Sequence, residues 1–322
     1  MDFKKPRVAL YYNVLPQTGY RNDGANLFLH YNYKKLLDGQ DAYGNPDMMK
    51  SDVGNIVALS PIDPFSHFGS FDLNGLVDYG EDGLGIPLNW EIPHPNFYWI
   101  ADSHRGYEYR LNRAKQFDTI FMSHKPSIEK FIKDGIPADK IHYMPWAAEP
   151  MAYRPFSIME KYNWCFIGHL THYDRIALCD RFCKEWPLGE KGYLGWRQGE
   201  FPGHNVFEDA ARKYCQSRIV LNESILDDVN MRDFEVLACK RLLLREDIPG
   251  IHDHFENGKH LVLFNSIDDA VEKAKYYLEH EDKRNAIAEA GYKEFLDKHT
   301  YMHRAKEILK VCLNYELPSI SI

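Results

Sequence analysis

The sequence lacks long apolar runs. No segment reaches the roughly 18 uninterrupted apolar residues that a membrane helix requires. The first residues, MDFKKPRVALYYN, hold charges followed by only a strand-length apolar stretch, which is too short for the core of a secretory signal peptide. We therefore expect no membrane span, and the sequence predicts a cytoplasmic protein.

Paired cysteines and metal-binding spacings are also missing. The six cysteines include no C-x-x-C pair, and most lie in apolar periodic segments, where a reduced thiol behaves as a small hydrophobic group. His67, His94 and His124 have no spacing typical of metal ligands. We expect structural thiols, no metal site and no cofactor.

An excess of positive charge is absent as well. The chain has 39 Lys and Arg against 47 Asp and Glu, a formal net charge of −8. This balance argues weakly against broad binding to a nucleic-acid backbone, because such binding depends on basic surface. A local basic groove stays compatible with it. The apolar share of 44% and the charged share of 27% are typical of a folded globular protein.

Short apolar runs alternate with helical patterns in the N-terminal half. Such runs are typical of buried parallel strands, and their alternation with helices indicates an α/β fold. Strands are predicted over residues 7–13, 55–60, 97–101, 119–123 and 140–144, and helices over 25–37, 107–116 and 127–133. Segments 39–52 and 66–95 are rich in Gly, Pro, Asn, Asp and aromatic residues, so they are predicted to be loops or an irregular insertion.

A second domain is expected because 322 residues are many for one hydrophobic core. Pro145, Pro150 and Pro155 interrupt the pattern, as in a linker, and we place the boundary between residues 152 and 153. Ser266 is a predicted N-cap for a helix ending at Leu278. The alternation then gives strands over 164–167, 192–194, 218–221, 241–244 and 261–264 and final helices over 282–296 and 301–313.

The segment NMRDFEVLACKRLLLRE, residues 230–246, combines a helix start with a following strand. Asn230, Met231 and Arg232 begin the helix, where unpaired N–H groups and a positive dipole end suit a diphosphate. Glu235, one turn further, can accept both hydroxyls of a ribose. The alternative for Glu235 is a solvated residue on an amphipathic helix.

Two loops that follow predicted strands carry polar residues, and ligands of open α/β sheets bind at the carboxyl ends of strands. Gly168 and His169 follow one strand, and the next helix bears Arg175; glycine admits a close phosphate and a guanidinium neutralises it. Asp102 and His104 follow another strand and can touch a sugar or orient a hydroxyl. The alternatives are a plain strand-to-helix turn at Gly168 and a helix cap at Asp102.

The segment of residues 230–246 resembles part of the donor domain of CgeB-like glycosyltransferases, which are related to the retaining GT-B families. The matching residues are Asn230, Arg232, Phe234, Glu235, Ala238 and Cys239. Related enzymes carry two acidic residues separated by seven others, and Asp227 and Glu235 have this spacing, with aspartate in place of the usual glutamate. Lys240 stands where the family usually has glycine. Further landmarks extend the resemblance over roughly residues 95–312.

The resemblance implies an α/β fold of the GT-B class, with two Rossmann-like doubly wound domains facing a cleft. Residues 1–152 would form the acceptor-side domain, with a C-terminal helix at about 300–322 packing back on it, and residues 153–299 the donor domain. Gly19 would lie in a loop over the donor phosphates, although its loop has no glycine doublet. Gly168, His169 and Arg175 would face the diphosphate, and His104 the sugar.

The implied function is transfer of a sugar from a UDP- or GDP-linked donor to an acceptor hydroxyl, with retention of configuration and without a metal. Two other classes stay open, a GT-B sugar-nucleotide epimerase and a catalytically silent sugar-binding or structural protein. The acceptor can be a glycan, a metabolite or a modified nucleobase in DNA. The sequence does not indicate an oligomeric state.

Overall fold

The structure is a computed structural model. It describes residues 6, 8–11, 29, 32–33, 35–37, 41–42, 56–59, 72–78, 92–101, 103–104, 106–170, 172–195 and 206–316. The chain forms two compact units: unit 1 comprises Met1–Pro145 and Tyr301–Ile322, and unit 2 comprises Trp146–Thr300. The units thus divide at Pro145, seven residues before the predicted boundary at 152, and the last helix belongs to unit 1.

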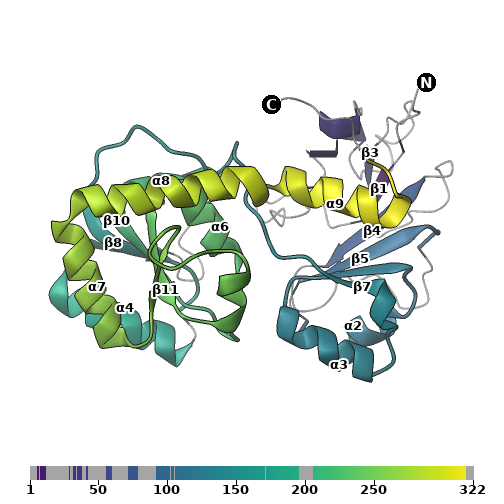
Figure 1. Ribbon diagram of the computed structural model, residues 1–322, viewed down its shortest axis with the longest axis horizontal. Coiled ribbons are helices and arrows are strands. Elements are labelled where there is room, and N and C mark those ends of the chain that lie inside the picture. The colour runs from purple at the N-terminus through teal and green to yellow at the C-terminus, as the bar shows by residue number, and fades with distance from the viewer. Residues whose placement is uncertain are drawn as a thin grey trace. The chain divides into compact units, whose positions relative to one another are not determined.

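Unit 1 contains a parallel sheet in the order β2-β3-β1-β4-β5-β6-β7 (Figure 1). Its strands are β1 Val8–Tyr11, β2 Asp41–Ala42, β3 Ile56–Leu59, β4 Leu73–Asp78, β5 Asn96–Ile100, β6 Thr119–Met122 and β7 Ile141–Tyr143. Its helices are α2 Tyr107–Ala114, α3 Ile128–Lys133 and α9 Tyr301–Leu313. Residues 29, 32–33 and 35–37, within the predicted helix 25–37, are helical.

Helices cover both faces of this sheet. On β5, Tyr98 stacks on Phe117, which follows α2, with ring centroids 5.1 Å apart. Its neighbour Trp99 faces Tyr301 of α9 at 6.3 Å. Successive side chains of a strand point to opposite faces, so α2 and α9 lie on opposite sides. Arg304 Nε of α9 also donates to the carbonyl of Pro145 at 2.8 Å, which ties the final helix to unit 1.

Strand β4 corrects the prediction that residues 66–95 are a loop or an irregular insertion. Leu73–Asp78 is a central strand between β1 and β5. A Cβ on Gly75 would lie 2.2 Å from the Phe97 ring, so glycine is needed for the two strands to pack. The sequence LNGLVD lacks a β-branched run, and its strand conformation depends on its two neighbours. Strand β2 similarly lies within the predicted loop 39–52.

Unit 2 contains a second parallel sheet, in the order β12-β11-β10-β8-β9. Its strands are β8 Tyr162–Ile167, β9 Gly192–Gly195, β10 Ser217–Asn222, β11 Leu242–Glu246 and β12 Val262–Phe264. Its helices are α4 Tyr173–Glu185, α5 Val206–Cys215, α6 Met231–Ala238, α7 Ile267–Glu279 and α8 Glu281–Lys298. The order reverses between β8 and β10, because the chain runs from β8 out to β9 and then back to β10 on the other side.

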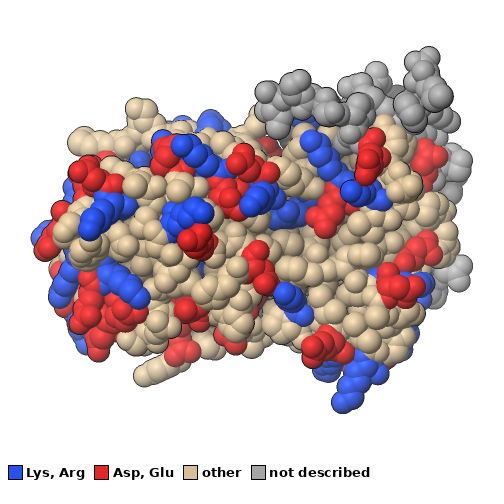
Figure 2. Space-filling view, in the orientation of Figure 1, with Lys and Arg blue, Asp and Glu red and all other residues tan. Residues whose placement is uncertain are grey.

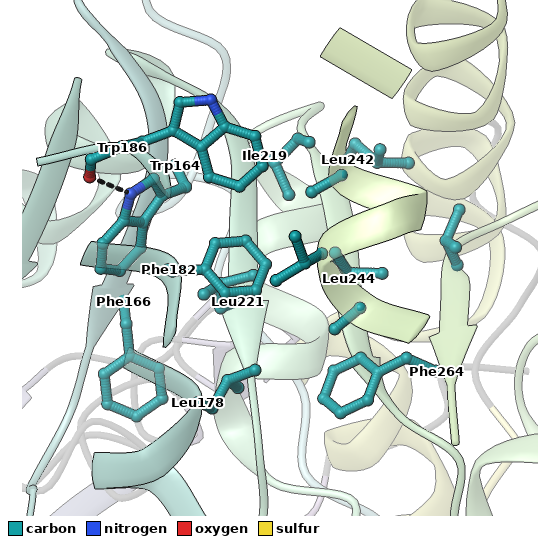
Figure 3. Close-up of a cluster of buried hydrophobic side chains, with 14 of the residues drawn as sticks. Trp164, Phe166, Leu178, Phe182, Trp186, Ile219, Leu221, Leu242, Leu244 and Phe264 are labelled. Atoms are coloured by element: carbon teal, nitrogen blue, oxygen red, sulfur yellow. Dashed lines mark hydrogen bonds between the residues drawn. The ribbon is translucent and has the colours of Figure 1, made fainter. Parts of the chain in front are cut away.

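The core of unit 2 lies between this sheet and helices α4 and α7 (Figure 3). Trp164 of β8 packs edge-on to Phe182 of α4 at 5.5 Å, and its Nε1 donates to the Trp186 carbonyl at 3.0 Å. Ser266 caps α7 as predicted, accepting a hydrogen bond from the Asp269 amide at 3.2 Å. Because successive side chains of a strand point to opposite faces, the side chains on the other face of this sheet pack against α5, α6 and α8.

Surface charge is mixed on the face drawn in Figure 2, where acidic and basic side chains are interspersed without an expanse of one sign. Among the helices that the structure describes, none is long and apolar enough to cross a membrane.

Candidate active site

The switch point of unit 2 lies between β8 and β10, and this is where open α/β sheets bind ligands, beyond the carboxyl ends of the strands. Gly168 directly follows β8. A Cβ on Gly168 would lie 2.0 Å from Nη2 of Arg232 in α6, so the missing side chain leaves room for this guanidinium. The structure therefore brings together the Gly168 loop and the start of α6, which are more than 60 residues apart in the sequence.

Two guanidinium groups converge on the ring of Phe166, the penultimate residue of β8. The central carbon of Arg232 lies 4.5 Å from the ring centroid and that of Arg175 lies 5.8 Å from it. Arg175 is buried and donates from Nε to the Glu223 carbonyl at 2.7 Å and from Nη1 to the His169 carbonyl at 3.3 Å. Burial, followed by the charge of Arg232, lowers the pKa of Arg175 to about 10, so Arg175 stays charged at neutral pH.

Arg232 retains capacity for a ligand. Its Nη1 donates to Asn222 Oδ1, whereas its Nε is buried and has no hydrogen-bond partner among the residues that the structure describes. Buried donors normally have partners, so an unpaired one beside a second positive charge favours an anionic ligand.

The start of α6 is capped. Asn230 Oδ1 accepts from the Arg232 amide at 3.1 Å, and Asp233 Oδ2 accepts from the Asn230 amide at 3.0 Å, which completes a capping box. Met231 is the first helical residue and is half-buried. The Asn230 side chain thus occupies part of the helix start that the sequence analysis assigned to a diphosphate.

A buried ion pair, which was not predicted from the sequence, anchors α6 to the end of β11. Asp233 and Arg245 are both fully buried, with Asp233 Oδ2 2.6 Å from Arg245 Nη1. Asn222 Nδ2 donates to Asp233 Oδ1 at 2.6 Å. The only sequence signal was Arg245 at the end of the apolar run LLLR, where a buried charge requires a partner.

Glu235 lies on α6 with its carboxylate among tyrosines. Tyr214 donates its hydroxyl to Glu235 Oε2 at 3.2 Å, and the Tyr153 hydroxyl is a second donor. Burial raises the pKa of Glu235 against these hydrogen bonds and the charge of Arg232. The two tyrosines orient the carboxylate, which is half-buried rather than the solvated residue of the alternative interpretation.

Two further carboxyl groups follow β10 and end β11, and neither was identified from the sequence. Glu246 Oε1 accepts from Ser224 and from Arg245 Nη2 at 2.9 Å. Glu223 Oε2 and Glu246 Oε2 are buried and have no hydrogen-bond partner within the described part of the chain. Burial, and then the negative charge of Glu246, raises the pKa of Glu223 to about 7.

Asp227 and Lys240, the two residues at which the sequence departs from the resembling family, have left-handed backbone conformations. Asp227, the predicted counterpart of the first acidic residue, is exposed with φ 51°. Lys240 has φ 54° and follows Cys239, the C-cap of α6. Left-handed residues after a helix are usually glycine, which explains physically why the resembling family has glycine at the Lys240 position.

In unit 1, imidazoles and hydroxyls gather at the carboxyl ends of β5 and β6. His104 is exposed, and its ring lies edge-on to that of His124 with centroids 6.2 Å apart. Ser103 is fully buried and donates to Ser127 Oγ at 2.8 Å, and Ser127 Oγ lies 2.7 Å from His124 Nδ1. His124 was considered in the sequence only as a metal ligand, and the structure places it beside His104.

Gly19 and Asp102 lie outside the described residues, so their assignments stay predictions. The structure brings Gly168, His169, Arg175, Asn230, Met231, Arg232 and Glu235 together within unit 2, and Asp227 lies in the loop before α6. No group of three or more His, Cys, Asp or Glu suited to a metal ion occurs among the residues described.

The architecture of two parallel sheets flanked by helices is that of the GT-B class, and solved structures match it over nearly the whole chain. HepE from Anabaena, solved with UDP and glucose, has a TM-score of 0.67 and 12% identity, covering 96% of this chain and 100% of that chain. Sucrose-phosphate synthase from Thermosynechococcus elongatus has 0.59 and 9%, covering 95% and 98%. A glycosyltransferase from Rickettsia africae has 0.60 and 12%, covering 98% and 100%. The predicted fold class is confirmed.

Residues 175–310 match the family described as glycosyl transferase-like. This segment begins at Arg175 and includes Arg232, Glu235 and the buried pair of Asp233 and Arg245. In a chain with the GT-B fold, the match indicates a glycosyltransferase. No curated protein matches the sequence.

Proposed function

We propose that unit 2 binds the diphosphate of a UDP- or GDP-linked sugar at the β8/β10 switch point and that the protein transfers this sugar to an acceptor hydroxyl. The observation that carries the proposal is the convergence of Arg175 and Arg232 on Phe166 beside Gly168. Two like charges held together raise the free energy of the unliganded site, and an anion between them lowers it.

The leaving group of this reaction is a nucleoside diphosphate, on which negative charge develops as the bond to the sugar breaks. Guanidinium groups held in place by Glu223, His169 and Asn222 stabilise that charge without reorganising. They supply the positive charge that a metal ion provides in other enzymes, which supports a metal-independent mechanism.

Glu235 is proposed to accept the ribose hydroxyls of the donor. Its carboxylate is oriented by Tyr214 and Tyr153, and it lies on the same helix as Arg232, three residues away. The HepE structures solved with UDP and with UDP-glucose support a nucleotide-sugar donor for a chain of this fold. The residues matched between Asn230 and Cys239 support the CgeB-like subgroup and, with it, retention of configuration.

His104 and His124 are proposed to face the sugar or the acceptor, because each can donate or accept a hydrogen bond to a hydroxyl. Asp102 and Asp227 are proposed to contact the sugar, and Gly19 is proposed to contact the phosphates. The leaving phosphate can itself take the acceptor proton in a retaining reaction, so the proposal requires no separate base.

A thermal-shift panel of UDP- and GDP-sugars tests the donor site. A ligand at 100 times its dissociation constant adds about 2.7 kcal/mol to the free energy of unfolding, which is a readily measured shift. We expect one nucleotide sugar to stabilise the wild type and Glu235→Gln to weaken this effect, while the response to inorganic pyrophosphate, which lacks a ribose, is unchanged. An equal response of both proteins to every nucleotide would contradict the ribose assignment.

Transfer itself is tested by adding acceptors to the stabilising donor, with a glycan, a small metabolite and a hydroxymethylated DNA in the panel. Release of free nucleoside diphosphate only when an acceptor is present supports a transferase. Formation of an epimeric nucleotide sugar without any acceptor indicates the epimerase, and no reaction with any acceptor indicates the silent binding protein. The anomeric configuration of the product, measured by NMR, then tests retention.

A further inference from the structure

Glu223 lies at the switch point itself. It directly follows β10, and its carbonyl accepts the 2.7 Å hydrogen bond from Nε of Arg175. The residue is half-buried, and its Oε2 is inaccessible to water and has no hydrogen-bond partner among the described residues. A carboxylate oxygen in this situation favours the neutral form, because ionisation places charge where nothing solvates it.

Charged and titratable groups face Glu223 from the elements packed against it. Asp174, Arg175 and Cys179 face it from α4, and Arg245 and Glu246 from the end of β11. Glu246 Oε1 accepts hydrogen bonds from Ser224 and Arg245. Its second oxygen, Oε2, therefore adds negative charge near Glu223 without hydrogen bonding to it. Asp228, in the loop after β10, and His169 and His172, in the loop before α4, are further titratable groups near Arg175.

The balance of these groups favours protonation near neutral pH. Burial, Glu246 and Asp174 raise the pKa of Glu223 to about 7, and Arg175 and Arg245 oppose them only in part. The residue that anchors Arg175 is therefore divided between its neutral and ionised forms under ordinary conditions.

We propose that Glu223 is a positioning residue that sets the charge of the diphosphate site, and that binding of a sugar-nucleotide diphosphate converts it to the neutral acid with uptake of one proton from water. The inference rests on the proposed donor site and concerns a residue outside the motif that identified that site. An ionised Glu223 adds negative charge beside Arg175 and repels the diphosphate. Neutral Glu223 removes that repulsion and leaves the positive charges of Arg175 and Arg232 to the ligand.

Calorimetry of UDP-glucose binding in buffers with different ionisation enthalpies measures this proton directly. A sugar-linked diphosphate has no ionisation of its own near neutral pH, so any uptake belongs to the protein. At pH 7.5 we expect the wild type to take up about three quarters of a proton, and we expect the loss of affinity above pH 7 to approach tenfold per pH unit. Glu223→Gln should bind with an affinity independent of pH and with almost no uptake.

Glu190→Gln is the matched control, because Glu190 is an exposed carboxylate at the amino end of β9, away from the carboxyl ends of the strands. This variant should leave the proton uptake unchanged. Uptake that persists in Glu223→Gln, or that disappears in His169→Gln or His172→Gln instead, overturns the inference. If Glu223→Gln does not fold, wild-type affinity that is constant between pH 6.5 and 8.5 overturns it equally.

Failure of the proposed donor site would give a different result from failure of the role proposed for Glu223. If the wild type binds neither UDP-glucose nor a GDP-sugar, the proposed function is wrong and the inference falls with it. Binding that depends on Arg232 but takes up no proton leaves the function in place and rejects only the role of Glu223.

Discussion

The carboxyl ends of the two sheets differ in chemistry. In unit 2 they carry guanidinium and carboxylate groups, of which Arg175, Asp233 and Arg245 are buried and Arg232 is half-buried. In unit 1 the described carboxyl ends of β5 and β6 carry hydroxyls and imidazoles, namely Ser103, His104 and His124. The two units thus share an architecture but present different chemical groups at the carboxyl ends of their strands.

The difference is instructive because burying charge requires compensation. Arg232 and Arg175 are tolerated at the switch point of unit 2 because carbonyls, an amide side chain and the Phe166 ring hold them, and an anionic ligand would complete that set. Neutral hydroxyls and imidazoles need no such compensation and suit contacts with sugar or acceptor hydroxyls. We infer that the charge of the donor is recognised in unit 2.

The largest expected effect follows from removing one partner of the buried charges in unit 2. Asp233→Asn should destabilise the protein by about 3 kcal/mol, because the fully buried Arg245 then loses its closest counter-charge and keeps only that of Glu246. Urea unfolding measures this change. In unit 1, Ser103→Ala removes a buried neutral hydrogen bond and should cost only about 1 kcal/mol. Similar losses in both variants would show that the two edges do not differ in this way.

The same Asp233 experiment has a surface control. Asp282→Asn changes an exposed aspartate in the first turn of α8 and should alter the free energy of unfolding by less than about 0.5 kcal/mol. Replacing both partners, as Asp233→Asn with Arg245→Met, should recover part of the loss, because the charge of Arg245 is then no longer buried.

An intermediate effect is expected on ligand affinity. Arg232→Gln should weaken binding of the nucleoside diphosphate by about 10- to 100-fold, since a hydrogen bond to a charged group contributes about 1.5–3 kcal/mol. His104→Gln in unit 1 should leave this affinity within about twofold and lower the rate of transfer instead. Calorimetry and turnover measurements separate the two outcomes.

Arg181→Gln provides the matched arginine control for this comparison. Arg181 lies on α4, where it pairs with Glu185 at 2.8 Å, and it is partly exposed. Its replacement should not change nucleotide affinity. A loss as large as that of Arg232→Gln would attribute the effect to overall charge rather than to the switch point.

The smallest expected effect concerns the end of α6. Lys240→Gly should stabilise the protein by about 0.5 kcal/mol, because glycine adopts φ 54° without strain, partly offset by loss of the exposed ion pair with Glu289. Lys240→Ala removes the same ion pair and keeps the strain, so it should be destabilising. Thermal unfolding of the two variants distinguishes the backbone contribution from the ion pair, and equal values would exclude backbone strain at this position.

Much of the fold follows from local patterns in the sequence. The strands of unit 2, the cap at Ser266 and the helices on both sides of His299 are confirmed, because apolar periodicity and capping chemistry act over a few residues. The GT-B class is confirmed as well. Strand β4 was missed because the Phe97 ring of the neighbouring strand requires glycine at position 75. The local sequence pattern contains no information about this contact.

The candidate site divides in the same way. Gly168, Arg175 and Arg232 could be singled out by sequence, since glycine and arginine beside strand and helix ends have a direct chemical meaning for phosphate. Their roles stay predictions. Glu223 and Glu246 could not be singled out, because their importance depends on partners and burial that arise only when β10 and β11 lie side by side. The sequence by itself thus determined the elements and the phosphate-type residues of unit 2. The tertiary structure alone decided which charges are buried together, because burial and the distances between charges arise from packing.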